Sequence, residues 1–194
     1  MRALPKAAKV FEAGLTQTPD YRMAISQGRS YGFLGKWVDA AHVFAKLFEQ
    51  EPLLNSRDKR KLDSAVTKAK PELTSAYIDW GVAERMAATV DGDKDRLRRC
   101  RDVIFTPLCN TLKADVKPQE YWASRYHLVK TLMDVGAYGD AQLSVEDVQR
   151  QVNPNFDEDK FGYKKLFEAA IEELKTKNFD RGAKDKKDDK DKPK

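Results

Sequence analysis

Helical periodicity runs through nearly the whole chain of 194 residues. Apolar residues recur three and four positions apart in successive segments, and no segment alternates apolar and polar residues over the length of a strand. Glycine, proline or aspartate interrupts this pattern where helices are expected to begin or end. The sequence therefore predicts an all-α protein, with helices over residues 5–17, 20–34, 38–50, 72–89, 94–114, 119–135, 140–152 and 158–177.

Two stretches depart from simple amphipathic helices. Residues 53–70 are highly charged and carry only a short apolar stripe, which predicts a short helix there. Pro107 lies inside the predicted helix 94–114. Because proline has no amide hydrogen and its ring clashes with the preceding turn, we expect Pro107 to kink or split that helix.

The charge balance and the ends of the chain set its class. There are 36 Lys+Arg and 31 Asp+Glu, so the net charge is +5, and 41% of the residues are hydrophobic, which is enough for a core. No apolar run approaches the roughly 18 residues of a membrane span, and the first residues lack the apolar stretch of a signal peptide. We therefore expect a cytoplasmic protein without a membrane span.

The last residues have a different composition from the rest. Residues 180–194 contain only Asp, Lys, Arg, Gly, Ala and Pro, so no large apolar side chain offsets the entropy of ordering them. We expect one helical domain over residues 1–178 and a disordered, Lys/Asp-rich tail over 179–194.

Neither cysteines nor histidines form a metal-binding pattern. Cys100 and Cys109 fall on one predicted helix, roughly 14 Å apart along its axis, which is too far for a disulfide and predicts two reduced thiols in or near the core. His42 and His127 stand without ligands at metal-binding spacing. We expect packed or surface histidines and no metal site.

Catalytic motifs are also missing. Residues 28–32 match G-x-S-x-G, the nucleophile elbow, but that motif requires a strand before a strained turn, and here it falls in the predicted helix 20–34. No glycine-rich phosphate loop is present, and the carboxylates are scattered. We therefore expect neither enzymatic activity nor a cofactor.

The densest basic cluster consists of Arg96, Arg98, Arg99 and Arg101. At 100° per residue these side chains spread over more than half of the helix circumference, so they do not form one stripe that could follow a phosphate backbone. A solvated helix face is the favoured interpretation. A nucleic-acid accessory role remains an alternative.

The predicted helices come in pairs, and the pairs resemble one another. The stretch 35–40 (GKWVDA) is echoed by 136–141 (GAYGDA). A small residue, an aromatic residue and a proline also recur after 33 residues: Ala7, Phe11 and Pro19 are followed by Ala40, Phe44 and Pro52.

This pattern resembles the tetratricopeptide repeat, a helix–turn–helix unit of 34 residues. The best copy spans residues 21–52, the last copy ends at Pro154, and a middle copy spans 72–115. In the best copy the family positions are Gly28, Tyr31, Gly35, Trp37, Ala40, Phe44 and Pro52. In the last copy they are Trp122, Gly136, Tyr138, Ala141, Val145 and Pro154, with Val129 and Leu132 departing from the pattern. The middle copy fits only through Tyr77, Trp80 and Gly81.

The resemblance implies a fold of antiparallel helix pairs stacked as a right-handed superhelix, with the helix 158–177 as a terminal cap. An irregular helical bundle, which obeys the same packing rules, is the alternative. The predicted helix 5–17 corresponds to the second helix of a pair, so it either caps the stack or marks the chain as part of a longer protein.

The resemblance also implies a concave groove, lined by the first helix of each pair, that holds a partner peptide. Transferred to this chain, the groove positions are Arg22, Ile25, Arg29 and Phe33 in the best copy, and Ala123, Tyr126, Lys130 and Met133 in the last copy. Arg29 and Lys130 occupy equivalent places. A basic floor of this kind would suit an acidic or C-terminal peptide.

The function expected from the sequence is therefore a non-enzymatic protein–protein interaction module or scaffold. Its partner would be a peptide or a neighbouring domain held in the groove. Two alternatives stand beside it: a nucleic-acid accessory protein that uses its basic surface, and a structural segment of a larger assembly.

Overall fold

The computed structural model describes residues 21–50, 71–114, 118–151 and 161–188. Within these ranges the backbone is helical apart from turns, and no residue lies in a strand, which confirms the all-α class. The predicted helices 5–17 and 53–70 lie outside the described residues. None of the described helices is long and apolar enough to cross a membrane. The elements are α2 (Tyr21–Phe33), α3 (Trp37–Gln50), α5 (Pro71–Asp91), α6 (Lys94–Arg99), η1 (Cys100–Phe105), α7 (Thr106–Thr111), α8 (Pro118–Val135), α9 (Tyr138–Gln151) and α10 (Tyr163–Asp188).

One kind of turn joins α2 to α3, α5 to α6 and α8 to α9. Each turn contains a glycine with positive φ: Gly35 at 73°, Gly92 at 68° and Gly136 at 88°. The residue after the glycine donates its N–H, at 2.9 Å, to the carbonyl five residues earlier; the bonds run from Lys36 to Tyr31, from Asp93 to Ala88 and from Ala137 to Leu132. This is the bonding of a Schellman C-cap, in which glycine avoids the strain of a side chain. The three pairs therefore share their turn geometry.

The second helix of the middle pair is irregular. It begins as α6, continues as the π-helix η1 and ends as α7, with Pro107 in the first turn of α7. The N–H of Thr106 donates to the carbonyl of Arg101, five residues back, in the π-helical register. The split predicted at Pro107 is confirmed, because the missing amide interrupts the α-helical ladder at this point.

A close contact between a glycine and a phenylalanine holds two of the pairs together. A Cβ on Gly28 would lie 2.6 Å from Cζ of Phe44, and a Cβ on Gly81 would lie 2.5 Å from Cζ of Phe105. Both rings are buried, with 2% and 0% of their surface exposed. A glycine on the first helix thus leaves the space that a ring on the second helix fills.

The middle pair is a longer version of the first. Gly81 stands four residues farther from its turn glycine than Gly28 does, and Phe105 stands four residues farther than Phe44. Four residues make slightly more than one helical turn. In the second helix the added residues coincide with the π-helical segment, which ends at Phe105.

The last pair has different side chains at the two positions that correspond to this glycine and phenylalanine. Val129 and Val145 stand at the positions that correspond to Gly28 and Phe44, counted from Gly136, and both are buried. The first helix has a larger residue than glycine and the second has a smaller residue than phenylalanine. Such a change keeps the total side-chain volume similar, and cores tolerate it. This accounts for the departure at Val129.

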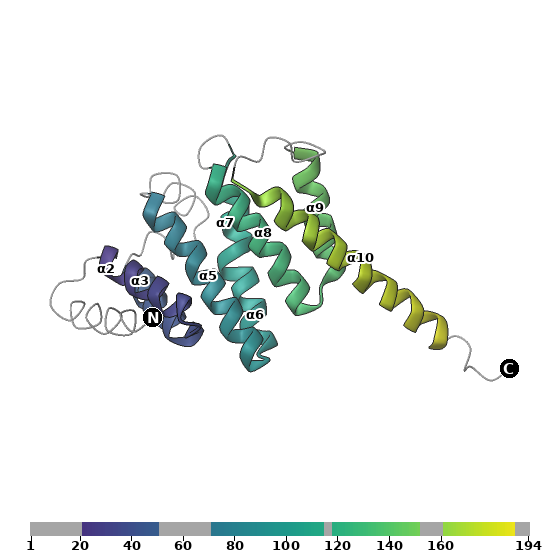
Figure 1. Cartoon of the computed structure of the whole chain (residues 1–194), viewed down its shortest axis with the longest axis horizontal. Coiled ribbons are helices and arrows are strands. Elements are labelled where there is room, and N and C mark those ends of the chain that lie inside the picture. The colour runs from purple at the N-terminus through teal and green to yellow at the C-terminus, as the bar shows by residue number, and fades with distance from the viewer. Residues whose placement is uncertain (1–20, 51–70, 115–117, 152–160, 189–194) are drawn as a thin grey trace.

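The pairs stack side by side, and α10 continues the stack (Figure 1). α5 packs against α2 and α3, and α8 packs against α5 and against α6, η1 and α7. In the same way α10 packs against both α8 and α9. It buries Phe167, Ala170 and Leu174 against them while Glu168, Glu172 and Lys175 are exposed.

The helix α10 is longer than expected. It extends to Asp188, into the segment 179–194 whose composition predicts a disordered tail, and Figure 1 shows it projecting beyond the other helices. Lysine and alanine have favourable helix propensity, so a polar segment that follows a packed helix can continue its backbone hydrogen bonds without a partner surface.

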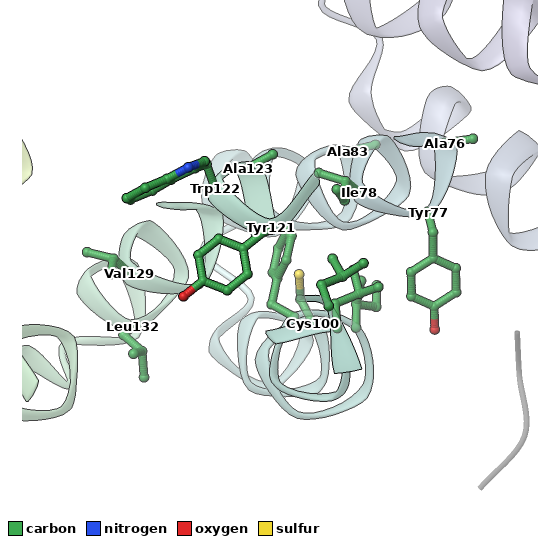
Figure 2. Close-up of a cluster of buried hydrophobic side chains, with 14 of the residues drawn as sticks. Ala76, Tyr77, Ile78, Ala83, Cys100, Tyr121, Trp122, Ala123, Val129 and Leu132 are labelled. Atoms are coloured by element: carbon green, nitrogen blue, oxygen red, sulfur yellow. The ribbon is translucent and has the colours of Figure 1, made fainter. Parts of the chain in front are cut away.

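One hydrophobic core connects the described helices. Figure 2 shows part of it, where Ile78 of α5, Cys100 of η1 and Tyr121 of α8 gather in one cluster. Cys100 and Cys109 are both buried and free, as the sequence predicts. Burial raises the pKa of the Cys100 thiol to about 12, so Cys100 is an unreactive packing residue.

Candidate binding pocket on the inner helices

The first helices of the three pairs and α10, here called the inner helices (α2, α5, α8 and α10), are linked in series by ion pairs. In each ion pair the cation belongs to the earlier inner helix and the carboxylate to the later one. The pairs are Arg29–Asp79 at 2.7 Å, Arg85–Asp134 at 3.1 Å and Lys130–Glu173 at 2.7 Å. An ion pair of the same orientation therefore links each inner helix to the next.

A pocket of about 380 Å³ lies between the four inner helices. All the residues that line it come from these helices. Ile78 and Ala123 supply apolar wall, and His127 and Tyr163 contribute rings. The remaining lining residues are polar or charged: Arg29, Glu72, Ser75, Asp79, Gln119 and Glu120.

Acidic groups outnumber basic ones in this pocket. The single guanidinium, that of Arg29, is engaged: Nε donates to Asp79 at 2.7 Å and Nη2 donates to Ser75 Oγ at 3.0 Å. Burial raises the pKa of Asp79, and the hydrogen bond from Arg29 opposes that rise. Within the described ranges, Glu72 and Glu120 form no ion pair or side-chain hydrogen bond. Two carboxylates are thus left without a counter-charge in this part of the chain.

His127 contributes a neutral imidazole. Its ring stacks on Phe105 with a centroid distance of 5.8 Å and meets Tyr126 at 5.2 Å. Burial, reinforced by the charge of Arg85, lowers the pKa of His127 to about 3, so the ring is uncharged near neutral pH. Its Nδ1 atom is buried and has no hydrogen-bond partner among the described residues.

The structure brings only some of the predicted groove residues to this pocket. Arg29 and Ala123 line it. Ile25 and Met133 are buried in the core, with 4% and 3% of their surface exposed, and Phe33 is 80% exposed at the end of α2. These three do not line the pocket.

The other predicted groove residues are engaged elsewhere. Tyr126 packs against α10, its ring centroid 6.1 Å from that of Tyr163 and 5.8 Å from that of Phe167. Lys130 of α8 forms an ion pair with Glu173 of α10. Arg22 is exposed, and its guanidinium lies 5.7 Å from the ring centroid of Tyr21. On α8, therefore, α10 covers the face that the resemblance assigned to a ligand.

The expected basic floor does not form. Arg29 and Lys130 do occupy equivalent places, but each one neutralises a carboxylate of the next inner helix. The residues that sequence reasoning missed are the acidic ones, Glu72 and Glu120. Each lies in the first turn of an inner helix that begins with proline, and this shared position is the signal that would have found them.

Three of the four arginines in the cluster have partners, whereas Arg99 is exposed and forms no ion pair within the described ranges. Arg96 pairs with Glu84 at 2.6 Å, Arg98 with Asp95 at 2.8 Å, and Arg101 with Asp102 at 2.6 Å. A phosphate backbone would have to compete with the carboxylates at Arg96, Arg98 and Arg101.

The G-x-S-x-G match lies wholly within α2, where Ser30 Oγ donates to the carbonyl of Ser26 at 2.8 Å. The strained turn of a nucleophile elbow is therefore absent at this motif. In the ranges that the structure covers, no group of three or more His, Cys, Asp or Glu residues is placed to hold a metal ion. Comparison of the chain with protein-family models, curated proteins and solved structures found no match.

Proposed function

We propose that the chain is a tetratricopeptide-like interaction module, a right-handed superhelix of helix pairs with α10 as its cap. Three observations support this proposal: the shared turn geometry, the glycine–phenylalanine contact in two of the pairs, and the repeated packing of each new inner helix on the pair before it. A module of this kind has no catalytic role. It presents a surface built from successive repeats.

The ligand of this module is a peptide segment of a partner protein, bound along the inner helices. The observation that carries the proposal is the pocket, because every residue that lines it comes from an inner helix and none comes from α3, α6, α7 or α9. In a stack of helix pairs the inner helices form the concave side, which is where an extended segment gains the most contact area.

Filling the pocket tests this function. Ala123→Trp places a large side chain on the pocket wall, and we expect it to abolish the enrichment of peptides from a phage-displayed library of random sequences. Ser75→Trp provides a second filling variant at a less buried position. Leu143→Trp is the matched control, since Leu143 is 59% exposed on α9, outside the pocket.

Circular dichroism verifies that each variant is folded before selection. Peptides that are enriched on the wild type and on Leu143→Trp, but on neither filling variant, support the proposal. Equal enrichment on all four proteins would contradict it, because the bound peptides would then occupy some other surface.

A further inference from the structure

We propose that the pocket on the inner helices accepts a cationic side chain, a lysine or an arginine of a basic partner peptide. This inference rests on the proposed function and names its ligand class. It reverses the expectation of an acidic peptide, which depended on Arg29 and Lys130 being available to a ligand.

The charge of the pocket is opposite to that of the whole chain. The protein has a net charge of +5, whereas the pocket wall combines Glu72, Asp79 and Glu120 with Arg29 as its one cation and with a neutral His127. Arg29 is committed to Asp79 and Ser75, so Glu72 and Glu120 determine the charge that a ligand meets. An anionic ligand would be repelled, and a cation would be attracted.

Acidic residues in the first turn of a helix also stabilise that helix through its dipole. The dipole alone could therefore explain why Glu72 and Glu120 are present. The second observation, independent of the acids, is His127. Its buried Nδ1 has no hydrogen-bond partner in the described part of the chain. A buried polar atom without a partner is unfavourable, and such atoms are few in native structures.

With the proton of the ring on Nε2, Nδ1 of His127 is an acceptor, and a cation can be its partner. The imidazole of His127 is neutral, so one of its nitrogens accepts hydrogen bonds and the other donates. An ammonium or guanidinium group carries only donors, whereas a carboxylate carries only acceptors and would add to the repulsion from Glu72 and Glu120. The Tyr163 ring is a further favourable surface for a cation.

The remaining walls suit the stem of such a side chain. Ile78 and Ala123 are 5% and 7% exposed, and they give the pocket an apolar surface on which methylene groups can pack. A volume of about 380 Å³ is at the lower end of the range for ligand sites, which fits one long side chain better than a folded domain.

The test uses two capped glycine–serine peptides that differ at one position, lysine in one and glutamate in the other. Isothermal titration at low salt measures their affinity for the wild type, for Glu72→Gln/Glu120→Gln and for Arg29→Gln. We expect the lysine peptide to bind the wild type, to bind the double variant about tenfold more weakly, and to bind Arg29→Gln about threefold more tightly. Glu168→Gln, an exposed acid on α10, is the control without effect.

The two sets of substitutions are expected to change the affinity for the lysine peptide in opposite directions. Preference for the glutamate peptide, or weaker binding by Arg29→Gln, would overturn it and restore the basic floor. Concentration-dependent self-association that the double variant abolishes would also overturn it, because a second copy of the chain would then be the occupant.

A small probe separates failure of this inference from failure of the proposed function. Butylammonium and butyrate are titrated while the His127 ring signals are followed by NMR. In one outcome, library peptides bind while each probe shifts the His127 signals equally, or not at all, in the wild type and in Glu72→Gln/Glu120→Gln. That result overturns the cationic ligand class and leaves peptide binding standing. If butylammonium alone shifts the His127 signals and no peptide binds, the peptide function is the part overturned.

Discussion

Replacing Gly81 by alanine is expected to lower the free energy of unfolding by about 1–3 kcal/mol, although alanine is the better helix former by about 1 kcal/mol. The added Cβ would lie 2.5 Å from Cζ of Phe105 and 2.9 Å from Cγ2 of Ile104, well inside van der Waals contact. Phe105 is fully buried, so its ring has no open space into which to move. Urea unfolding followed by circular dichroism measures the change.

Two further variants isolate the cause. Gly139→Ala is the matched control, because Gly139 is also helical and a Cβ there meets nothing within 4 Å, so we expect unchanged or increased stability. Phe105→Leu in the Gly81→Ala background shortens the opposing side chain and should recover part of the loss. If Gly81→Ala proves as stable as Gly139→Ala, the close packing of α5 on η1 is not what holds the middle pair together.

Acidification is expected to destabilise the protein by about 2 kcal/mol between pH 6.5 and pH 4.5 through His127 alone. The pKa of His127 is lowered to about 3 in the folded protein, first by burial and then by Arg85, from an ordinary value of 6.5. Between these two values the unfolded chain binds a proton that the folded protein does not. Stability is therefore full above pH 6.5 and is lost as the pH falls toward 3.

The comparison with His127→Gln isolates this contribution, since glutamine does not titrate. The pKa values of Asp79 and Asp134 are raised by burial, which favours the folded state as the pH falls, but both groups are present in both proteins. Below pH 6.5 the free energy of unfolding, measured at a series of pH values, should decrease less with falling pH in His127→Gln than in the wild type. Parallel profiles would show that His127 takes up protons equally well in the folded and unfolded states.

The regular pairs were predictable because their signals are local. Gly35 and Gly136 mark turns whose hydrogen bonds span only five residues, and Gly28 faces Phe44 across one such turn. The middle pair fits the pattern poorly because four residues are added on both sides of its turn. That addition hides the equivalence of Gly81 to Gly28 until the packing of Phe105 reveals it.

The charge of the pocket was not predictable from the pattern. The partners of Arg29 and Lys130 lie 50 and 43 residues farther along the chain, and helical periodicity says nothing about contacts at such separations. Of the groove residues expected from the repeat pattern, Arg29 and Ala123 line the pocket. Which charges remain available to a ligand depends on this tertiary pairing, which the pattern of a single sequence does not contain.

The serial ion pairs make the stack directional. Both α5 and α8 offer a cation to the inner helix after them and a carboxylate to the inner helix before them, so successive contacts are head-to-tail. Between separate units, head-to-tail contacts leave a new end with each added unit unless the units close into a ring. On its far side α10 exposes Glu168, Glu172 and Lys175 where another helix would have to dock. Along this side α10 therefore presents charged groups, in contrast to the apolar residues that it buries against α8 and α9.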